Sequence, residues 1–281
     1  MMDLMDRYCV IGHPVAHSKS PAIHAEFARQ SGQELVYERC LAPLDGFAAT
    51  VRQLVADGYR GANVTVPFKL DAAVLADTLS ARARAAGAVN TLSFTAAGIV
   101  GDNTDGVGLV NDIVRNAGVA IGGVRVLLLG AGGAARGAIL PLLEQGPREL
   151  VIANRTKATA AALAARFAPA VAGKVAVLAC EFAELDGAFD IVINATSASL
   201  AGTMPALPAG LFKPGALALD MMYGAAPSPF MLFAAAEGAR VRDGLGMLVE
   251  QAACAFQIWR GVAPQTGVLL AALRVQPKPQ P

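Results

Sequence analysis

Residues 124–143, VRVLLLGAGGAARGAILPLL, decide the fold. The apolar run VLLL (126–129) leads into a glycine-rich turn and then into an apolar helical pattern, as expected of a buried parallel strand followed by a helix. Gly130, Gly132 and Ala135 match the spacing G-x-G-x-x-G/A. The first glycine permits a tight turn, and the second lets a pyrophosphate approach the backbone N–H groups at the start of the helix. The stretch therefore predicts a dinucleotide site, with a purely structural glycine turn as the alternative.

Short apolar runs alternate with longer helical patterns on both sides of this stretch, which predicts a two-domain α/β fold with mostly parallel strands. The expected strands are 7–12, 34–40, 61–67, 124–130, 150–154, 175–179, 190–196 and 216–221. The expected helices are 21–31, 45–57, 69–86, 105–118, 134–145, 156–167, 228–238 and 247–260, with a shorter one after Pro264. VNTLSF (89–94) and GIVGDN (98–103) predict a hairpin. The last helices have no strand to follow them, so we expect them to pack on the first α/β unit.

The composition argues against several classes of protein. The chain has 281 residues, a net charge of +1 and 16% charged residues, without a basic block that would follow a phosphate backbone. Its four cysteines are isolated, which indicates neither a disulfide framework nor a zinc knuckle. The acidic N-terminus and apolar runs shorter than the ~20 residues of a membrane span argue against export and insertion. We expect a cytoplasmic protein that binds neither nucleic acid nor membrane, with a disordered tail at 277–281.

The strand after the glycine turn ends in LVIANRTK (150–157). About 20 residues after the glycines, an NAD enzyme places an acid that binds the ribose 2′-hydroxyl. Asn154 occupies this position and is followed by Arg155, Thr156 and Lys157. A guanidinium can pair with a 2′-phosphate that an acid would repel, so the sequence favours NADP over NAD. The alternative is that Asn154, Arg155 and Thr156 only cap the next helix.

Polar residues also gather near the end of a strand in the first half of the chain. In GANVTVPFK (61–69), Asn63 and Thr65 fall on one face of the strand, and a proline ends it before Lys69. The carboxyl ends of strands in an α/β sheet commonly face the ligand crevice. Lys69 could equally be a solvated charge, and Asp105 in GDNTDG could be the N-cap of the helix that follows.

HPVAHSKSP (13–21) and His24 hold all three histidines of the chain. These lack HExxH spacing and a carboxylate at a recognisable offset, so no metal site is predicted. No G-x-S-x-G elbow surrounds Ser18 or Ser20, which argues against a serine nucleophile. Ser20 is instead expected at the N-cap, with Pro21 at N1, so that a helix N-terminus and two hydroxyls can hold an anion.

The motifs HSKSP, GANVTVPFK, GAVNTL, GDNTDG, GAGGA, NRT, INATS and DGLGMLVEQA follow one another from about Arg7 to Pro264. In this order and spacing the sequence resembles the shikimate dehydrogenases. The resemblance implies a substrate-binding α/β domain at 1–105 and 247–281 and a Rossmann-type NADP-binding domain at 106–246. It also implies reversible NADPH-dependent reduction of 3-dehydroshikimate to shikimate, in the biosynthesis of chorismate and the aromatic amino acids.

The resemblance implies roles for individual residues. Lys69 resembles the family's acid–base lysine and Asp105 its partner aspartate, whereas Asp102 does not match. The residues that resemble substrate ligands are Ser18, Ser20, Asn63, Thr65, Lys69, Asn90, Asp105, Tyr223 and Gln251, with the two serines on the substrate carboxylate. Those that resemble cofactor ligands are Gly130, Ala131, Gly132, Gly133, Ala134, Asn154, Arg155, Thr156, Lys157, Met221 and Gly244.

The sequence departs from the family pattern at a few positions. His13 stands where the family more often has Asn or another polar residue. Thr159 stands where the family often has a further Arg, and this difference leaves the strength of the NADP preference open. Alternatives are a quinate/shikimate dehydrogenase with relaxed substrate or cofactor use, a catalytically silent NADP-binding regulator and a DNA-binding regulator. The resemblance is compatible with a monomer or a homodimer.

Overall fold

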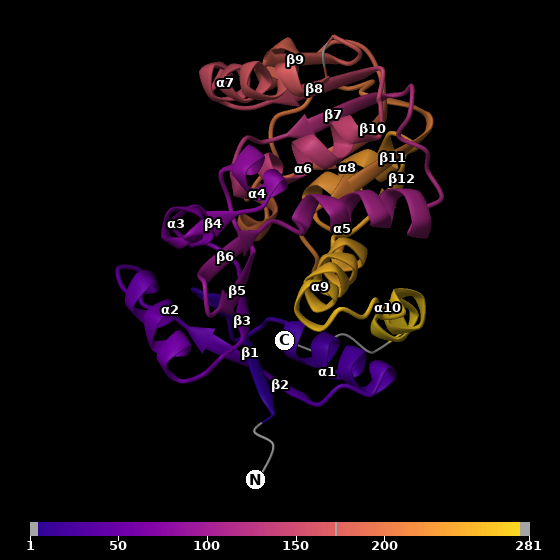
Figure 1. Ribbon diagram of the computed structural model, residues 1–281. Coiled ribbons are helices and arrows are strands. Elements are labelled where there is room, and N and C mark those ends of the chain that lie inside the picture. Colours follow the sequence, from indigo (N-terminus) through magenta and orange to yellow (C-terminus); the bar gives the residue numbers. More distant parts are fainter. Residues whose placement is uncertain (1–4, 172, 276–281) are drawn as a thin grey trace. The chain divides into compact units, whose positions relative to one another are not determined.

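The computed structural model describes residues 5–171 and 173–275 (Figure 1). These residues form two compact units, one within Met1–Gly108 and Val249–Val275 and the other within Leu109–Leu248. Each unit contains a six-stranded sheet with helices against it, so the predicted α/β class is confirmed. The tail predicted to be disordered, 277–281, lies outside the described residues.

The sheet of the first unit has the strand order β2-β1-β3-β5-β6-β4. The elements of this unit are β1 (Asp6–Gly12), α1 (Ser20–Ser31), β2 (Leu35–Leu41), α2 (Phe47–Ala56), β3 (Gly61–Val64), α3 (Lys69–Leu75), β4 (Thr78–Leu79), α4 (Ala81–Ala86), β5 (Thr91–Thr95), β6 (Gly98–Asp102), the start of α5 (Asp105–Asn111), most of α9 (Leu245–Arg260) and α10 (Thr266–Val275). β1 pairs in parallel with β2 and β3. β5 and β6 form the predicted hairpin, which joins the sheet antiparallel to β3.

The single helix predicted over 69–86 is wrong. α3 stops early, the short strand β4 pairs with β6, and α4 begins after Ser80. Asp77 interrupts the helix because its N–H donates to the carbonyl of Ile99 (2.9 Å) and its carboxylate accepts from the N–H of Ile99 (2.7 Å). The Ser80 hydroxyl then caps α4 by accepting from the N–H of Ala83 (3.1 Å). Short polar side chains that bond to the backbone favour such turns over a helix interior.

The sheet of the second unit is parallel throughout, with the order β12-β11-β10-β7-β8-β9 (Figure 1). Its elements include a π-helical turn η1 (Asp112–Asn116), β7 (Arg125–Leu129), α6 (Gly133–Glu144), β8 (Glu149–Ala153), α7 (Lys157–Phe167), β9 (Ala176–Cys180), β10 (Phe189–Asn194), β11 (Phe212–Asp220), α8 (Pro229–Ala236) and β12 (Arg240–Arg242). Counted from β7, this is the strand order of a doubly wound dinucleotide-binding sheet. β12 was not predicted, because a single valine between two arginines gives no apolar pattern.

The C-terminal helices return to the first sheet, as predicted. The indole N–H of Trp259 on α9 donates to the carbonyl of Leu92 in β5 (3.1 Å), and its ring stacks on Tyr8 of β1 with centroids 4.7 Å apart. The next residue, Arg260, forms an ion pair with Asp6. Because these contacts come from the last turn of α9, they fix that end of the helix against the sheet.

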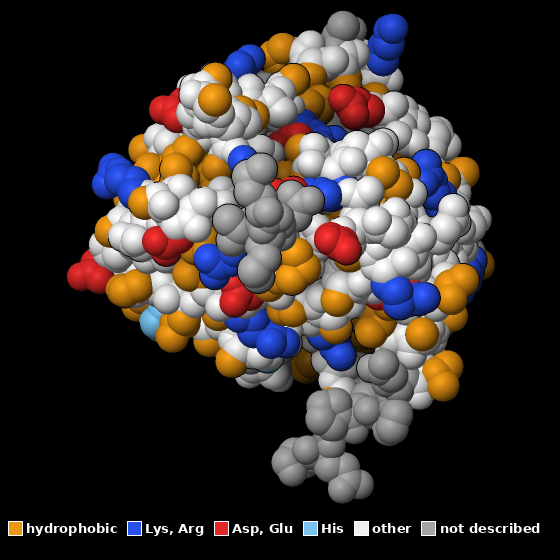
Figure 2. Space-filling view, turned by 60° about the horizontal axis from the view of Figure 1, so that its bottom comes forward, with side chains coloured by type: hydrophobic (Ala, Val, Ile, Leu, Met, Phe, Trp, Pro, Cys, Tyr) orange, Lys and Arg blue, Asp and Glu red, His pale blue; other side chains and the backbone are white. Residues whose placement is uncertain are grey.

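The surface charge is mixed. On the face seen in Figure 2, Lys and Arg side chains stand among Asp and Glu side chains, without a continuous basic surface. Pairs such as Arg7 with Glu38 (3.0 Å) and Arg29 with Glu26 (2.7 Å) bring opposite charges together. In the part of the chain that the structure describes, no helix is both long enough and apolar enough to cross a bilayer.

Candidate active site

Lys69 and Asp105 form an ion pair in the first unit. Lys69 is the first residue of α3 and Asp105 the first residue of α5. Nζ of Lys69 lies 2.6 Å from Oδ2 of Asp105, and the two side chains are 17% and 6% exposed. Lys69 is therefore not a solvated surface charge, and Asp105 is not a simple N-cap. The pair offers an ammonium with partial access to solvent, oriented by a buried carboxylate.

Asn90 connects this pair to its neighbours. Its side-chain N–H₂ group donates to Oδ1 of Asp105 (2.9 Å), Oγ1 of Thr104 (2.9 Å) and Oε1 of Gln251 (3.2 Å). Its Oδ1 accepts from the N–H of Thr104 (2.8 Å) and the hydroxyl of Thr91 (2.9 Å). Asn90 is buried, and buried hydrogen bonds of this kind are strong and hold one geometry. Both oxygens of Asp105 are thus held in place, one by Lys69 and one by Asn90.

Sequence reasoning missed Thr91 and Thr104. Each follows an asparagine. One Asn-Thr pair, 90–91, lies where the first strand of the hairpin begins, and the other, 103–104, directly follows its second strand. In the antiparallel register of β5 and β6, Thr91 lies opposite Asp102, so the two pairs meet at the open end of the hairpin. A repeated Asn-Thr at the base of a predicted hairpin is the signal that could have identified them.

Asp102, which the resemblance excludes, has a structural role. Its carboxylate accepts from Nε and Nη2 of Arg82 (2.7 and 2.9 Å) and from the Ser80 hydroxyl (2.6 Å). Burial alone would raise the pKa of Asp102, but Arg82 and Ser80 together hold that pKa below its usual value. Its charge is therefore already compensated by Arg82.

Asn63 in β3 belongs to the same network. Its Nδ2 donates to Oγ1 of Thr91 and to the carbonyl of Asn90 (both 3.2 Å), while its Oδ1 accepts from the Tyr37 hydroxyl (2.7 Å). A carbonyl can only accept, so the amide nitrogen of Asn63 must face Asn90 and its oxygen must face Tyr37. Burial raises the pKa of Tyr37 well above its usual value, so the phenol remains a donor. No motif surrounds Tyr37, and the sequence gives no signal for it.

The two serines of HSKSP lie together, but the predicted N-cap is wrong. The N-cap of α1 is Lys19, and Ser20 and Pro21 are the first helical residues. The Ser18 hydroxyl donates to that of Ser20 (3.2 Å) and accepts from the N–H of Ser20 (3.3 Å), so Ser18 supplies the capping oxygen. Arg39 donates to the carbonyl of Ser18 (2.6 and 3.1 Å). The start of α1 thus brings together two hydroxyls, a helix N-terminus and a nearby guanidinium. This combination favours the binding of an anion.

The other predicted substrate ligands lie in both units. Thr65 follows β3 and is partly exposed, and its hydroxyl makes no hydrogen bond to the residues that the structure describes. A Cβ at Gly12 would lie 2.4 Å from the Thr65 methyl, so glycine is needed beside it. Gln251 is buried on α9. Tyr223 lies after β11 in the second unit, and its role as a substrate ligand stays a prediction.

His24 is fully buried behind Tyr37. The two rings stack with centroids 4.1 Å apart and planes 6° apart. Neither ring nitrogen of His24 has a hydrogen-bond partner among the described residues. Burial lowers the pKa of His24 to about 3, although the nearby Asn63 side chain favours the charged form slightly. His24 is a neutral core residue, and across 5–171 and 173–275 no three His, Cys, Asp or Glu side chains gather as a metal site.

We expect His24 to make the fold sensitive to acid. The native ring titrates near pH 3 and an unfolded histidine near 6.5, so only the unfolded chain binds the extra proton between these values. The contribution of neutral His24 to the free energy of unfolding is therefore complete above about pH 6.5. It falls by up to about 1.4 kcal/mol per pH unit on acidification through this window. Urea unfolding at several pH values should show that His24→Phe, which keeps the stacked shape, has a smaller pH dependence than the wild type. Identical pH dependences would contradict this interpretation.

The predicted dinucleotide turn connects β7 to α6. Gly130 has a φ of +102°, and a Cβ there would lie 3.2 Å from the backbone of Ala195, so only glycine fits. A Cβ at Gly132 would meet nothing within 4 Å, which leaves open space over the free N–H groups of the first turn of α6. Ala135 is fully buried, as close contact between helix and strand requires. The turn therefore has the open helix start that a pyrophosphate needs.

The four residues after β8 differ in what they contact. Asn154 donates to the carbonyl of Thr156 (3.1 Å), and Thr156 is the N-cap of α7, yet its side chain makes no capping hydrogen bond. Arg155 is exposed and has no ion pair or hydrogen bond with any described residue. Lys157 instead pairs with Glu184 (2.7 Å), which raises the pKa of Lys157. The alternative of a simple cap is not supported, and the Arg155 guanidinium is the one left open to a ligand.

Met221 and Gly244 adjoin each other at the end of β11. The N–H of Met221 donates to the carbonyl of Asn194 (2.9 Å), and that of Gly244 to the carbonyl of Met222 (3.0 Å). A Cβ at Gly244 would lie 2.1 Å from the carbonyl oxygen of Met221. Glycine is therefore required for the two segments to approach each other.

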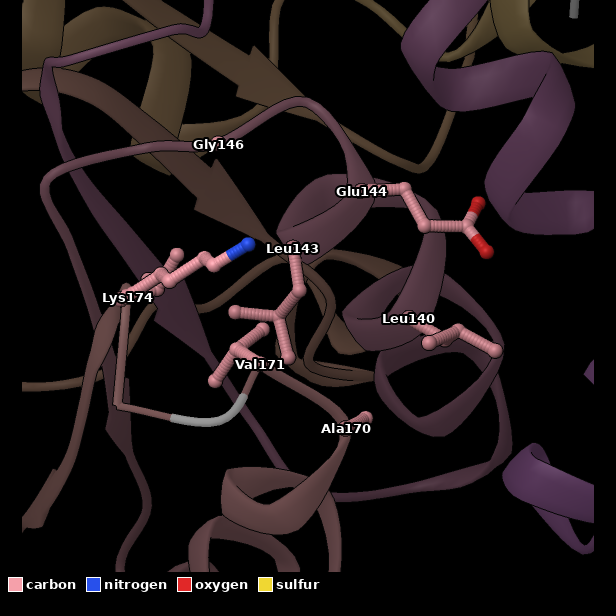
Figure 3. A pocket seen from close by; sticks show the side chains of 8 residues that line it. Leu140, Leu143, Glu144, Gly146, Ala170, Val171 and Lys174 are labelled. Carbon is pink, nitrogen blue, oxygen red and sulfur yellow. The ribbon is translucent and has the colours of Figure 1, made fainter.

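A hollow of about 290 Å³ lies elsewhere in the second unit, beside the end of α6 (Figure 3). Leu140, Leu143 and Val171 contribute apolar side chains to its lining. Lys174 extends its amine toward Leu143, whereas Glu144 turns its carboxylate away (Figure 3). None of the predicted substrate or cofactor residues lines this hollow.

Three family models match successive parts of the chain. Residues 10–92 match the shikimate dehydrogenase substrate binding domain, residues 112–203 the shikimate / quinate 5-dehydrogenase model, and residues 244–274 the shikimate 5′-dehydrogenase C-terminal domain.

Individual proteins match over nearly the whole chain. Shikimate dehydrogenase (NADP(+)) of Janthinobacterium sp. (strain Marseille) is 62% identical over 269 residues, which are 96% of this chain and 97% of the relative. An Ael1 enzyme from Pseudomonas putida is 48% identical with a TM-score of 0.89, over 97% of this chain and all of that one. Shikimate 5-dehydrogenase from Thermus thermophilus, solved in complex with NADP(H) and shikimate, is 33% identical with a TM-score of 0.82, over 96% of this chain and 99% of that one. The protein belongs to the shikimate dehydrogenase family.

Proposed function

We propose that the protein is an NADP-dependent shikimate dehydrogenase that reversibly reduces 3-dehydroshikimate to shikimate, in the biosynthesis of chorismate and the aromatic amino acids. The observation that carries this proposal is the Lys69–Asp105 pair, which Asn90 joins to a set of buried amide and hydroxyl groups. Amide and hydroxyl groups suit a polyol, because between them they can donate to and accept from its hydroxyls. The relative from Janthinobacterium, named as an NADP-dependent shikimate dehydrogenase, supports the same activity.

In the direction of reduction, the ketone oxygen of the substrate gains negative charge and must receive a proton. Lys69 is the assigned donor of that proton, because a lysine ammonium carries three N–H donors. Asp105 accepts a hydrogen bond from one N–H of the Lys69 ammonium and so directs the other N–H groups toward the substrate. Asn90 holds the second oxygen of Asp105. Bound NADPH supplies the hydride. The chain's own contribution is to place and hold a proton donor at the ketone oxygen.

The substrate carboxylate is assigned to Ser18 and Ser20, beside the N-terminus of α1. Replacing either serine by alanine removes one hydrogen bond to a charged group, so KM for shikimate should rise about tenfold or more while kcat changes by less than about threefold. Steady-state kinetics would measure both constants. Ser31→Ala is the control, since that hydroxyl bonds only to backbone carbonyls at the far end of α1. An unchanged KM in both variants would remove the two serines from the carboxylate site.

The second unit fits NADP. Its glycine turn leaves room over the N–H groups of α6, no acid follows β8 at position 154, and Arg155 has no partner among the described residues. We assign the 2′-phosphate to Arg155, with Asn154 and Thr156 beside it. Lys157 is a weaker candidate, because Glu184 already holds its ammonium. Gly130, Ala131, Gly132, Gly133 and Ala134 are assigned to the pyrophosphate, and Met221 and Gly244 to the remaining part of the cofactor.

We propose that the first unit binds substrate and the second binds NADP, with domain limits at 1–105 with 247–281 and at 106–246. The cytoplasm is the proposed location. Thr65, Asn63 and Gln251 are assigned to the substrate hydroxyls, together with Tyr223 from the second domain. A monomer or a homodimer is compatible with these assignments.

Oxidation of shikimate and of quinate with NADP⁺ tests the proposal against its closest alternative. We expect kcat/KM to be higher for shikimate, since quinate carries an additional hydroxyl that would be buried without a partner in a site built for shikimate. Comparable values for the two substrates would support a quinate/shikimate dehydrogenase. Binding of NADP⁺ without turnover of either substrate would support a silent NADP-binding regulator.

A further inference from the structure

A buried carboxylate lies beneath the predicted cofactor loops of the second unit. Asp220 ends β11 and is fully buried. Its Oδ2 accepts from the hydroxyls of Ser228 (2.6 Å) and Ser199 (2.7 Å) and from Nδ2 of Asn194 (3.2 Å), and its Oδ1 accepts from the N–H of Met222 (3.0 Å). In the described ranges no lysine or arginine pairs with it, so four uncharged donors hold the carboxylate. A satisfied buried network of this kind is rigid, and losing one member leaves the others unpaired.

The donors come from two loops that leave neighbouring strands. Asn194 ends β10, where it lies opposite Asp220 in the parallel register, and Ser199 lies in the loop that follows. Met222 and Ser228 lie in the loop after β11, where the Ser228 hydroxyl also caps α8 by accepting from the N–H of Met231 (3.3 Å). One side chain thus connects both loops at the carboxyl end of the sheet.

Both loops contact residues assigned to the cofactor. Asn194 Oδ1 accepts from the N–H and the hydroxyl of Thr196 (3.1 and 2.7 Å), and the Thr196 methyl lies 3.2 Å from the position of a Cβ at Gly130. In the other loop, the carbonyl of Met222 accepts from the N–H of Gly244 (3.0 Å). The network around Asp220 therefore reaches the glycine turn on one side and Gly244 on the other.

We propose that Asp220 is a positioning residue for the nicotinamide half of the cofactor. In a doubly wound sheet, a dinucleotide crosses the point where the strand order reverses, and its adenosine ribose is recognised after the second strand. That strand is β8, followed by Arg155, on one side of β7. The nicotinamide half then falls on the other side, over the loops after β10 and β11 that Asp220 holds. Asp220 touches neither cofactor nor substrate and acts through these loops; the inference rests on the proposed NADP function.

Asp220→Asn tests this inference, because it places an N–H₂ group of nearly the same shape among four donors. We expect kcat/KM for NADPH to fall about 10–100-fold, through both kcat and KM. The Kd of 2′,5′-ADP, which carries the 2′-phosphate but no nicotinamide, should change less than about twofold. Asp190→Asn is the matched control, since Asp190 accepts from Lys213 and from the N–H of Arg125 at the opposite end of β10. It should leave both measurements unchanged.

Ser199→Ala and Ser228→Ala each remove a single donor. We expect each to lower kcat/KM for NADPH by about 2–10-fold while the Kd of 2′,5′-ADP stays nearly unchanged. These variants carry the test if Asp220→Asn does not fold. Equal weakening of 2′,5′-ADP and NADPH binding would reduce Asp220 to a residue of general stability and overturn the inference, as would unchanged NADPH kinetics. Failure of the wild type to oxidise NADPH would refute the proposed function instead, and would appear before any variant is made.

Discussion

Replacing Lys69 by alanine is expected to lower kcat for the reduction of 3-dehydroshikimate by about 10²–10⁴-fold, with a much smaller change in KM. The developing charge on the ketone oxygen needs a proton in the transition state, whereas binding of the ground state depends on many other groups. The position of the ammonium is well defined, since Asp105 lies 2.6 Å from it and is itself held by Asn90. Steady-state kinetics with saturating NADPH would give both constants.

The control for this variant is Lys213→Ala. Lys213 also pairs with an aspartate at 2.7 Å, but in the second unit, near the start of β11 and at the other end of that strand from Met221. It should leave kcat unchanged, because partly exposed ion pairs contribute little to stability. A loss confined to KM in Lys69→Ala would make Lys69 a binding group and leave the proton donor unidentified.

Replacing Arg155 by alanine is expected to lower kcat/KM for NADPH by about 10–100-fold and to leave kcat/KM for NADH nearly unchanged. Arg155 is exposed and unpartnered among the described residues, so binding a phosphate breaks no existing ion pair. The 2′-phosphate is the group that distinguishes the two cofactors, and a planar guanidinium can bind it through two hydrogen bonds. The ratio of the two kcat/KM values is the measurement, because it is insensitive to the amount of active protein.

Lys157→Gln is the matched control for Arg155, since Glu184 already holds the Lys157 ammonium. We expect an effect of less than about threefold on NADPH, in keeping with the small net value of exposed charge pairs. Equal kcat/KM for NADPH and NADH in the wild type would overturn the interpretation of Arg155.

The sequence predicted those parts of the fold that depend on local pattern. β7 and α6 were clear because the strand is buried on both faces and the turn needs glycine at Gly130, and both requirements appear in consecutive residues. The hairpin of β5 and β6 was equally local. The helix over 69–86 failed because Asp77 bonds to Ile99, and a partner 22 residues away cannot be seen in the helical pattern.

The candidate site was predictable residue by residue but not as a network. Lys69, Asp105 and Asn90 came from the family resemblance, whereas their contacts depend on the register of a hairpin and the starts of two helices. Tyr37 was missed because it lies in β2 without a motif, and only the fold places its hydroxyl on Asn63. Residues that orient other residues leave little trace in a single sequence, since their role depends on a neighbour distant along the chain.

The most direct test of the proposed activity is the reaction of the purified protein with NADPH and a limiting amount of 3-dehydroshikimate. The loss of NADPH absorbance would be followed and the product identified by chromatography. We predict one shikimate formed for each NADPH oxidised, and loss of this turnover in Lys69→Ala. Binding of NADPH without its oxidation by 3-dehydroshikimate would contradict the proposed activity.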